Sequence, residues 1–431
     1  MKVQGYRKSL VSPIYFVLGF NLFTIVIFIT APYDWSRSDP NVTVLYLLLN
    51  MAFIYAGYRL GSGAGSRRNI KLNVPFKIPN AKITSFLFIF YSLTFLIKYA
   101  YLTRFPFYDI KGMISYLSLG FFDPQLAYNL SVYDSRSFTV SWILFTFISI
   151  FNQLFFIFGF ISWKSLKPFL RILLIFFVSI EVFYWLGRAT AFGIISLITT
   201  LVLCIISQRK SIKISFRSMV GIIVVFAFSI LFFGSLKQGR SGTVNLNLQN
   251  FDQGNASVLY NHYVLGFIPD DLTITYMYSV SYLAQGYYHL GLAMKNAPFS
   301  STFMLGNNPA LISIADNVGI HLWDRTYIHW LQVNCGIDEM AKWHSAYLWF
   351  ANDVSFLGVP FILFIIAYFS GYARAFALKH NDLMSKVVFV LTMSVLLYLF
   401  ANNTFLYQYF YSFTFVVSIW YFTRVRYIHL E

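Results

Sequence analysis

Hydrophobic residues lie along this chain in ten long runs separated by shorter polar segments. A helix of about 20 apolar residues crosses the hydrocarbon core of a bilayer, so each run predicts a membrane-spanning helix. The runs cover approximately residues 13–32, 42–60, 83–103, 139–163, 169–187, 189–207, 219–236, 348–373, 386–401 and 405–423. The pattern therefore predicts an all-α, polytopic membrane helix bundle of about 10 spans.

Two of the segments between runs are long enough to carry structure of their own. Residues 104–138 have apolar positions at helical intervals, which predicts a short helix lying on the membrane surface. Residues 237–346 form the one long hydrophilic stretch, expected as a large external loop between spans 7 and 8. The chain is thus expected to divide into 1–236 with spans 1–7, this loop, and 347–431 with spans 8–10.

The long loop contains one strong helix signal. Asp270 and Asp271 are suited to cap a helix, the helical pattern continues to about Lys295, and the Asn-Ala-Pro sequence at 296–298 would end it. Because this helix is amphipathic and rich in aromatic residues, two arrangements are open. Either the helix dips into the outer leaflet, or it packs on the helix bundle.

The composition and the distribution of charge support a membrane protein. Of the 431 residues, 58% are hydrophobic and 11% are charged, whereas about a quarter of a soluble domain is charged. The formal net charge is +16, and 20 of the 32 lysine and arginine residues lie in segments that ten crossings place on the N-terminal side. Short cation-rich loops stay in the cytoplasm, so both termini are expected there, and the basic charge is explained without nucleic acid.

Two further expectations concern the first apolar run and the two cysteines. No small-residue cleavage site follows the first run, so it is expected to remain as a span and not to be removed as a signal peptide. Cys204 lies in an apolar run and Cys335 in a polar loop, so no disulfide is expected between them.

The chain lacks the common motifs for nucleotides and catalytic metals. It contains no Walker-type glycine loop, HExxH, Cys/His metal spacing, GxSxG elbow or DxD pair. We therefore expect chemistry without ATP, with no cofactor and no metal site.

His344 is the histidine in the most suggestive position. It lies in KWHSAYLWF, where the long loop re-enters the membrane, and a neutral imidazole there can accept a proton from a sugar hydroxyl. An interfacial residue between Trp343 and Trp349 is an equally good interpretation. The other histidines of the loop are expected to be mostly solvated; they are His262, His289, His321 and His329.

Two arginines lie at the expected outer ends of spans. Arg188 forms the tight turn between spans 5 and 6, and Arg240 follows span 7. Each can extend to lipid headgroup phosphates. Alternatively, both converge on a diphosphate, which guanidinium groups bind bidentately, and Lys237 could assist.

Two further polar features have a structural and a functional interpretation. Glu181 is a carboxylate deep in a predicted span, where a structural pairing is favoured over a functional role. The segment 321–329 combines Asp324, Arg325 and His329 with aromatic residues, a mixture that suits sugar rings. Aromatic residues are also common in the interfacial belts of membrane proteins.

The order of these features resembles the Wzy-type polymerases of bacterial O-antigen and exopolysaccharide repeat units, GT-C-like enzymes related in plan to the O-antigen ligases. Three features carry the resemblance. They are the motif LGRATAFGIISL around Arg188, a second arginine after the next span at Arg240, and a long loop that ends in His344 and Tyr347. The resemblance in plan covers residues 85 to 400.

The resemblance implies that undecaprenyl-diphosphate-linked oligosaccharides are polymerised at the outer face of the bacterial inner membrane. The reaction would be an inverting, metal-independent glycosyl transfer in which Arg188 and Arg240 hold the diphosphate and His344 orients or deprotonates the acceptor hydroxyl. Expected partners besides membrane lipids include a chain-length regulator protein. The residues expected to bind the remaining substrate are Lys237, Asp324, Arg325, His329 and Tyr347.

Other functional classes share part of this layout. An O-antigen ligase has the same plan. A membrane O-acyltransferase would need a histidine near an early span, but the first histidine is His262. A lipid-linked glycan flippase favours short loops and paired halves, which an external loop of 110 residues over 237–346 fits poorly.

Overall fold

The computed structural model describes residues 12–67, 85–95, 109–133, 150–190, 192–209, 234–235, 256–307, 309–339, 342–401 and 418–419. Within these residues every regular element is a helix, and the one β contact is an isolated bridge between Tyr33 and Val258. The all-α fold class is therefore confirmed for the described part of the chain.

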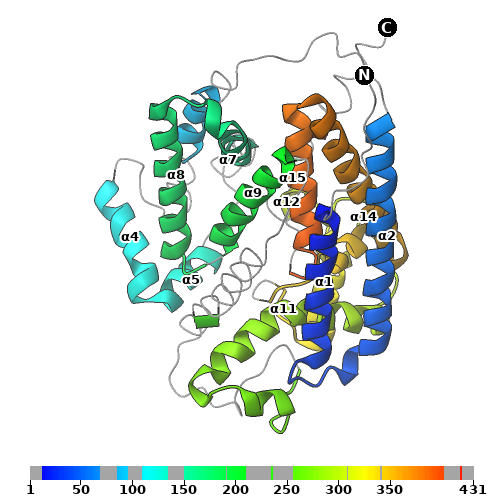
Figure 1. The fold of residues 1–431 in the computed structure, drawn as a ribbon. Coiled ribbons are helices and arrows are strands. Elements are labelled where there is room, and N and C mark those ends of the chain that lie inside the picture. Colours follow the sequence, from blue (N-terminus) through cyan, green and yellow to red (C-terminus); the bar gives the residue numbers. More distant parts are fainter. Residues whose placement is uncertain are drawn as a thin grey trace.

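The helices form two groups that meet at α9 (Figure 1). One group holds α4, α5, α7 and α8, and the other holds α1, α2, α14 and α15, with α11 across its lower end. The longer elements are α1 (Pro13–Thr30), α2 (Pro40–Arg67), α4 (Ile110–Phe122), α5 (Pro124–Tyr133), α7 (Ile150–Ser162), α8 (Pro168–Gly187), α9 (Phe192–Gln208), α11 (Asp270–Asn296), α12 (Pro309–Asn317), α13 (Tyr327–Cys335), α14 (Ala346–His380) and α15 (Leu383–Leu397). Short 3-10 turns include η1 (Ser36–Ser38), η5 (Tyr263–Phe267) and η6 (Trp323–Arg325).

Four described helices, α1, α2, α8 and α14, are long and apolar enough to cross a membrane. Shorter apolar helices cover Ser85–Phe95, α9 and α15. The predicted spans at 219–236 and 405–423 lie almost entirely outside the described residues. A membrane-embedded helical protein is thus supported, whereas the count of about 10 spans is not confirmed.

A row of glycines brings α2 and α14 into backbone contact. Gly57, Gly61 and Gly65 recur every four residues, so they lie on one face of α2. A Cβ on Gly61 would lie 2.0 Å from the Tyr368 carbonyl oxygen, and a Cβ on Gly57 would lie 2.3 Å from that of Phe364. Small residues of this kind let two membrane helices approach closely enough for backbone packing.

The helix α14 is interrupted at Ser355, whose φ of 59° and ψ of 172° are not helical. The preceding segment, 346–353, is buried at every position. Asp353 holds a loop against the break, since its carboxylate accepts hydrogen bonds from the Thr302 hydroxyl and the Gly306 amide. A short buried helix therefore leads from residue 346 into the long helix that follows.

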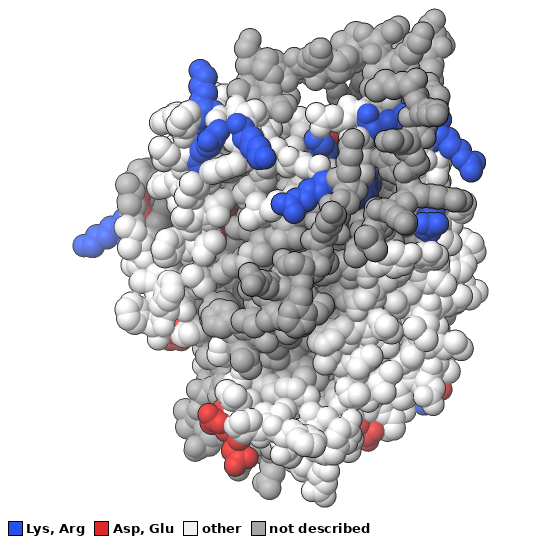
Figure 2. Space-filling view, viewed as in Figure 1, with Lys and Arg blue, Asp and Glu red and all other residues white. Residues whose placement is uncertain are grey.

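Basic residues gather at one end of the molecule. Figure 2 shows most lysine and arginine side chains of this face at one end and most acidic ones at the other. Lys379 Nζ donates to the Ser66 carbonyl oxygen over 3.1 Å, and the Arg374 guanidinium donates to the carbonyl oxygens of Ile206 and Arg209. The basic ends of α2, α9 and α14 are therefore joined, which is the grouping that the positive-inside pattern predicts.

The loop helix predicted from 270 to about 295 is present as α11, but its cap differs. Pro269 is the N-cap residue, while Asp270 and Asp271 lie in the first turn, where their charges favour the helix dipole. The helix packs on the bundle: Tyr33 donates to the Met277 carbonyl oxygen, and the hydroxyls of Tyr287 and Thr24 are 2.8 Å apart. Of the two open arrangements, packing on the bundle is confirmed.

The segment 104–138 contains two helices, α4 and α5, where one short helix was expected. Asp109 begins α4 by accepting a hydrogen bond from the Gly112 amide. The helix lies against α8, because a Cβ on Gly120 would be 2.3 Å from the Gly187 carbonyl oxygen. The expected surface helix therefore packs beside the end of α8.

Candidate functional site

The entry to α14 is fixed by backbone hydrogen bonds. The Ala346 amide donates over 2.9 Å to the carbonyl oxygen of Leu399, which follows the end of α15. Ser345 is the N-cap residue, and its backbone oxygen accepts the amide of Trp349, while its side chain makes no capping bond. These bonds fix the backbone just after His344, which is buried together with Ser345. Serine at an N-cap usually bonds through its hydroxyl, so a Ser345 hydroxyl without a partner among the described residues is unusual.

His344 is buried, with 1% of its surface exposed. Neither Nδ1 nor Nε2 has a hydrogen-bond partner among the described residues. Burial lowers the pKa of this imidazole to about 3, against a smaller opposing effect from the Asp338 carboxylate. The side chain is therefore a neutral imidazole at physiological pH, able to accept a proton or a hydrogen bond.

His289 on α11 packs beside it, with the two ring centroids 4.9 Å apart. Its Nδ1 lies 3.1 Å from the Trp343 carbonyl oxygen. A carbonyl only accepts, so we assign the proton to Nδ1, which leaves Nε2 as an acceptor. Burial places the pKa of His289 well below its usual value, and the neighbouring His344 lowers it further.

Several buried polar atoms without partners lie at this point. Besides both nitrogens of His344 and Nε2 of His289, the buried hydroxyls of Ser345 and Tyr347 have no hydrogen-bond partner among the described residues. Leaving a buried polar atom unpaired costs about 1–3 kcal/mol, so such groups are rare in structural cores. A cluster of them is typical of a functional site, and we call these four residues, His289, His344, Ser345 and Tyr347, the histidine cluster.

Arg188 is the C-cap residue of α8. Its Nη1 donates to the Tyr184 hydroxyl over 3.1 Å, and the guanidinium lies 5.6 Å from the Tyr184 ring and 5.4 Å from the Trp185 ring. The following Ala189 has φ of 50°, which makes the turn into α9 tight. The aromatic rings hold the charged group in a defined, half-buried position.

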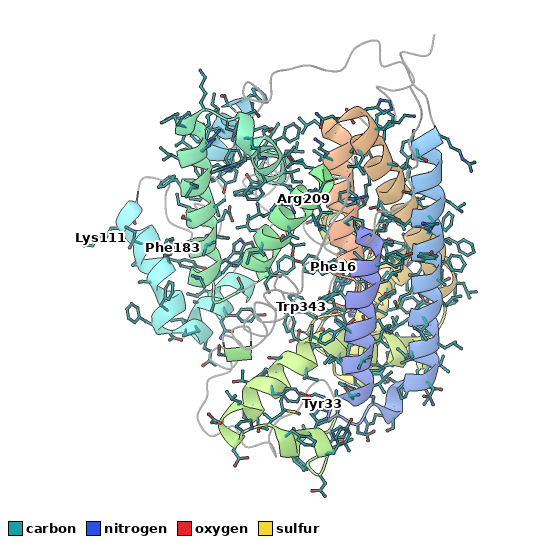
Figure 3. All side chains as sticks on the ribbon, in the orientation of Figure 1. Phe16, Tyr33, Lys111, Phe183, Arg209 and Trp343 are labelled. Carbon is teal, nitrogen blue, oxygen red and sulfur yellow. The ribbon has the colours of Figure 1, made fainter. Side chains whose placement is uncertain are left out.

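A series of ring contacts links Arg188 to the histidine cluster. Trp185 packs on Phe192 at the start of α9, with centroids 6.5 Å apart, and Phe192 packs on Trp343 at 5.8 Å. Trp343 directly precedes His344, and in Figure 3 it lies between the two groups of helices. Arg188 is therefore connected to the residue before His344 through three successive ring contacts.

The remaining predicted site residues have different outcomes. Arg240 and Lys237 lie outside the described residues. His329 pairs with Asp324 and Glu339, at 3.8 Å and 3.1 Å, and among the described residues no hydrogen bond or ion pair connects this group or Arg325 to His344. Tyr347 belongs to the histidine cluster, where its ring lies 6.2 Å from that of Tyr287.

His289 differs from its expected environment, whereas Glu181 has the structural contacts that were favoured for it. His289 was expected to be solvated, but it has no exposed surface. In the sequence, His289 lies in AQGYYHLGLA, a segment of small and apolar residues that predicts a buried helix face. Glu181 accepts hydrogen bonds from the Tyr91 hydroxyl and the Trp185 indole, which agrees with the favoured structural pairing.

Comparison with known proteins gives no relative: no family model, no curated protein and no solved structure matches this chain. The function is therefore inferred from the residues themselves.

The neutral state of the two histidines predicts a pH-dependent stability. An unfolded histidine has a pKa of about 6.5, whereas the folded values are lower. As the pH falls below about 6.5 the unfolded chain takes up protons first, so unfolding becomes easier by about 1.4 kcal/mol per pH unit for each histidine. Acidification from pH 7.5 to pH 5 should therefore lower the melting temperature of the purified protein.

Variants separate this effect from other titrating groups. His289→Gln with His344→Gln should flatten the pH dependence, while His321→Gln, which changes an exposed histidine, should keep the slope of the wild type. Equal slopes in all three proteins, measured by tryptophan fluorescence during heating, would contradict neutral buried imidazoles.

Proposed function

We propose that this protein is a glycosyltransferase that polymerises lipid-linked oligosaccharide repeat units at the outer side of the bacterial inner membrane. The observation that supports it most is the buried, neutral His344, whose two ring nitrogens have no partner among the described residues. Structural histidines are normally hydrogen-bonded when buried. A protein interior that presents an unpaired base suits a reaction in which a hydroxyl must lose a proton.

In the proposed reaction, a hydroxyl oxygen of one repeat unit attacks the anomeric carbon of the growing chain. The new glycosidic C–O bond forms as the bond between the anomeric carbon and the diphosphate oxygen breaks. The hydroxyl proton passes to a nitrogen of His344, and the leaving group is the polyprenyl diphosphate with its bonding electron pair. An anionic diphosphate nearby raises the proton affinity of the imidazole, which offsets the effect of burial on its pKa.

Arg188 is the proposed contact to the diphosphate. Its guanidinium is half-buried at the end of α8, the end opposite to the basic residues Lys164, Lys167 and Arg171 that precede or begin this helix. Because the cation-rich end faces the cytoplasm in the proposed topology, Arg188 faces the outer side. A fixed guanidinium there stabilises the negative charge that develops on the leaving oxygen.

The test uses purified protein in liposomes with undecaprenyl-diphosphate-linked repeat units. We expect a ladder of products from the wild type. Arg188→Ala should slow elongation about 10²-fold to 10³-fold, the usual cost of removing one charge-stabilising donor, with no loss of insertion. Arg171→Ala, an arginine at the other end of the same helix, is the matched control and should elongate normally.

Each competing function has a distinct result in this assay. A ligase would give one transfer to an added acceptor in place of a ladder, and a flippase would change the sidedness of the donor without forming a bond. Either result from active wild-type protein would contradict the polymerase.

A further inference from the structure

The segment after α11 exposes a group of large apolar side chains. Phe299, Phe303 and Met304 have 79%, 71% and 63% of their surface exposed. No charged residue lies between Lys295 and Asp316, although this stretch belongs to the long hydrophilic loop. An exposed apolar patch usually marks a surface that contacts a membrane or another protein. We call residues 297–307 the apolar loop.

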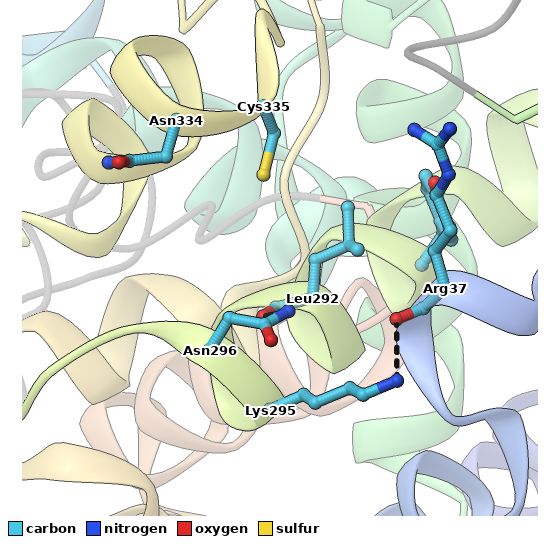
Figure 4. Close-up of a pocket in the computed structure, with 7 residues that line it drawn as sticks. Arg37, Leu292, Lys295, Asn296, Asn334 and Cys335 are labelled. Carbon is cyan, nitrogen blue, oxygen red and sulfur yellow. Dashed lines mark hydrogen bonds between the residues drawn. The ribbon is translucent and has the colours of Figure 1, made fainter.

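Hydrogen bonds fix the position where the apolar loop begins. The helix α11 ends at Asn296, and the Ala297 amide closes its last turn by donating to the Ala293 carbonyl oxygen. Lys295 Nζ donates over 3.4 Å to the carbonyl oxygen of Arg37, which ties this end of α11 to η1 (Figure 4). The loop therefore starts from a point that the N-terminal part of the chain holds in place.

The break in α14 holds the tip of the apolar loop. The Thr302 amide donates to the Asn352 carbonyl oxygen over 2.8 Å, and the Ser301 hydroxyl donates to that of Asp353 over 2.7 Å. On the other side of the tip, the Gly306 amide donates to the Asp353 carboxylate over 2.8 Å. The tip is therefore bound on both sides to the two residues that precede the break by two and three positions.

The two residues at the tip have an unusual backbone. Phe303 and Met304 have φ of 53° and 68°, in the left-handed region that residues other than glycine seldom adopt. Such a conformation persists where the surrounding contacts impose it, and it is most common at functional sites. Here the hydrogen bonds on either side impose it, so the two apolar side chains are presented on a fixed turn.

The break in α14 lies about one hydrocarbon thickness from the basic end of the bundle. Arg374 belongs to that end, since its guanidinium donates to carbonyl oxygens at the end of α9. Ser355 precedes Arg374 by 19 residues, a rise of about 28 Å along an α-helix, and the hydrocarbon core is about 30 Å thick. With the basic end at the cytoplasmic boundary, the break and the apolar loop bound to it lie at the outer boundary.

A stripe of α14 that faces lipid begins directly after the break. Leu357, Phe361 and Ile365 recur every four residues, so they lie on one face of the helix. Each has more than half of its surface exposed. In a helix that crosses a bilayer, an apolar face that no protein covers contacts acyl chains.

Two tyrosines connect the apolar loop to the start of this stripe. The Tyr327 ring packs on that of Phe356 with centroids 4.7 Å apart, and its hydroxyl accepts the Ser300 amide over 3.3 Å. The Tyr46 hydroxyl donates to the Phe356 carbonyl oxygen over 2.8 Å. Tyrosine is enriched at the boundary between membrane and water. The apolar loop therefore lies beside the first lipid-facing residues of α14.

We propose that the apolar loop inserts Phe299, Phe303 and Met304 into the outer leaflet of the membrane. The partner is the apolar part of the phospholipid layer, because the loop has no charged group to select a headgroup and adjoins a stripe that contacts acyl chains. Interfacial segments of this kind bury their apolar side chains about 5–10 Å deep, at the boundary of headgroups and acyl chains. The inference requires that α14 spans the membrane and does not depend on glycosyl transfer.

The experiment measures quenching of a fluorescent label on the full-length protein in phosphatidylcholine nanodiscs. Cys335→Ser removes the partly exposed cysteine, and Cys204 has no exposed surface, so Phe303→Cys can then be labelled selectively. A nitroxide near the headgroup end of the acyl chain should quench this label more than a nitroxide near the middle of the chain. Iodide in the water should leave it bright. Met304→Cys is a second probe and should give the same pattern.

Two control positions calibrate the depth. Ile365→Cys lies on the lipid-facing stripe ten residues after the break, or about 15 Å along the helix. Its label should be quenched most by the nitroxide in the middle of the acyl chain. Asp271→Cys replaces an exposed acidic residue in the first turn of α11, and its label should be quenched by iodide.

Two results would overturn the proposal. Iodide quenching of the two loop labels as strong as that of Asp271→Cys would show that the tip lies in water. Protection of these labels from iodide and from both nitroxides would show that protein, such as a second copy of the chain, covers the tip. Neither result bears on the polymerase, since the ladder assay tests glycosyl transfer and not depth in the membrane.

Discussion

Gly61→Ile is expected to prevent the protein from folding into a stable bundle. A Cβ at this position would lie 2.0 Å from the Tyr368 carbonyl oxygen and 2.7 Å from its carbonyl carbon. These are backbone atoms of α14 and cannot move as a flexible side chain can, so the two helices would have to separate. The cost should reach about 3 kcal/mol or more, seen as loss of the monodisperse peak in fluorescence-detected size-exclusion chromatography.

The same helix offers a matched control. Gly63 lies two residues further along α2, on another face, and a Cβ there would have no heavy atom within 4 Å. Gly63→Ile should therefore express and elute like the wild type, since it only replaces glycine by a better helix former. Normal elution of Gly61→Ile as well would show that α2 and α14 do not touch at their backbones.

This interface was partly readable from the sequence. The period of four among Gly57, Gly61 and Gly65 marks a face for close packing. Its partner was not predictable, because Phe364 and Tyr368 are some 300 residues away along the chain and nothing in their local pattern distinguishes them from other apolar residues. Hydropathy predicts that helices form, but it does not predict which faces meet.

The loop helix α11 shows the same division between local and distant information. Its bounds follow from Asp270, Asp271 and the Asn-Ala-Pro sequence at its end, which are local signals. Its burial depends on partners far along the chain, such as Thr24 and Ser345. A long hydrophilic stretch was therefore correctly predicted to contain a helix, while the position of that helix inside the bundle had to come from the structure.

Some residues of the candidate site were predicted from the sequence, and others were missed. His344 was identified from its position where the loop meets an apolar run, and Arg188 from the turn between two runs. His289 was missed because a histidine in a long loop is usually solvated, whereas here the ring is enclosed by α11 and the segment before α14. The break at Ser355 had no signal in the sequence, since serine with φ of 59° is rare and Asp353 is bound by residues some 50 positions away.

His344→Ala is expected to lower the rate of chain elongation by about 10²-fold to 10⁴-fold, the usual contribution of a positioned general base. The lipid-linked donor should still bind, because Arg188 and the proposed diphosphate contacts are unchanged. The measurement is ladder formation in liposomes together with donor binding to the same preparation. His321→Ala, which removes an exposed histidine of the same loop, is the control and should retain full activity.

Stability separates a catalytic His344 from a structural one. The imidazole nitrogens make no hydrogen bond within the described residues, so a buried apolar side chain of similar size would remove an unpaired polar group and leave none behind. His344→Leu should therefore be inactive and at least as heat-stable as the wild type, a combination typical of a site that trades stability for function. A variant that is inactive only because its melting temperature has collapsed would instead make His344 a structural residue, and full activity of His344→Leu would remove it from the reaction.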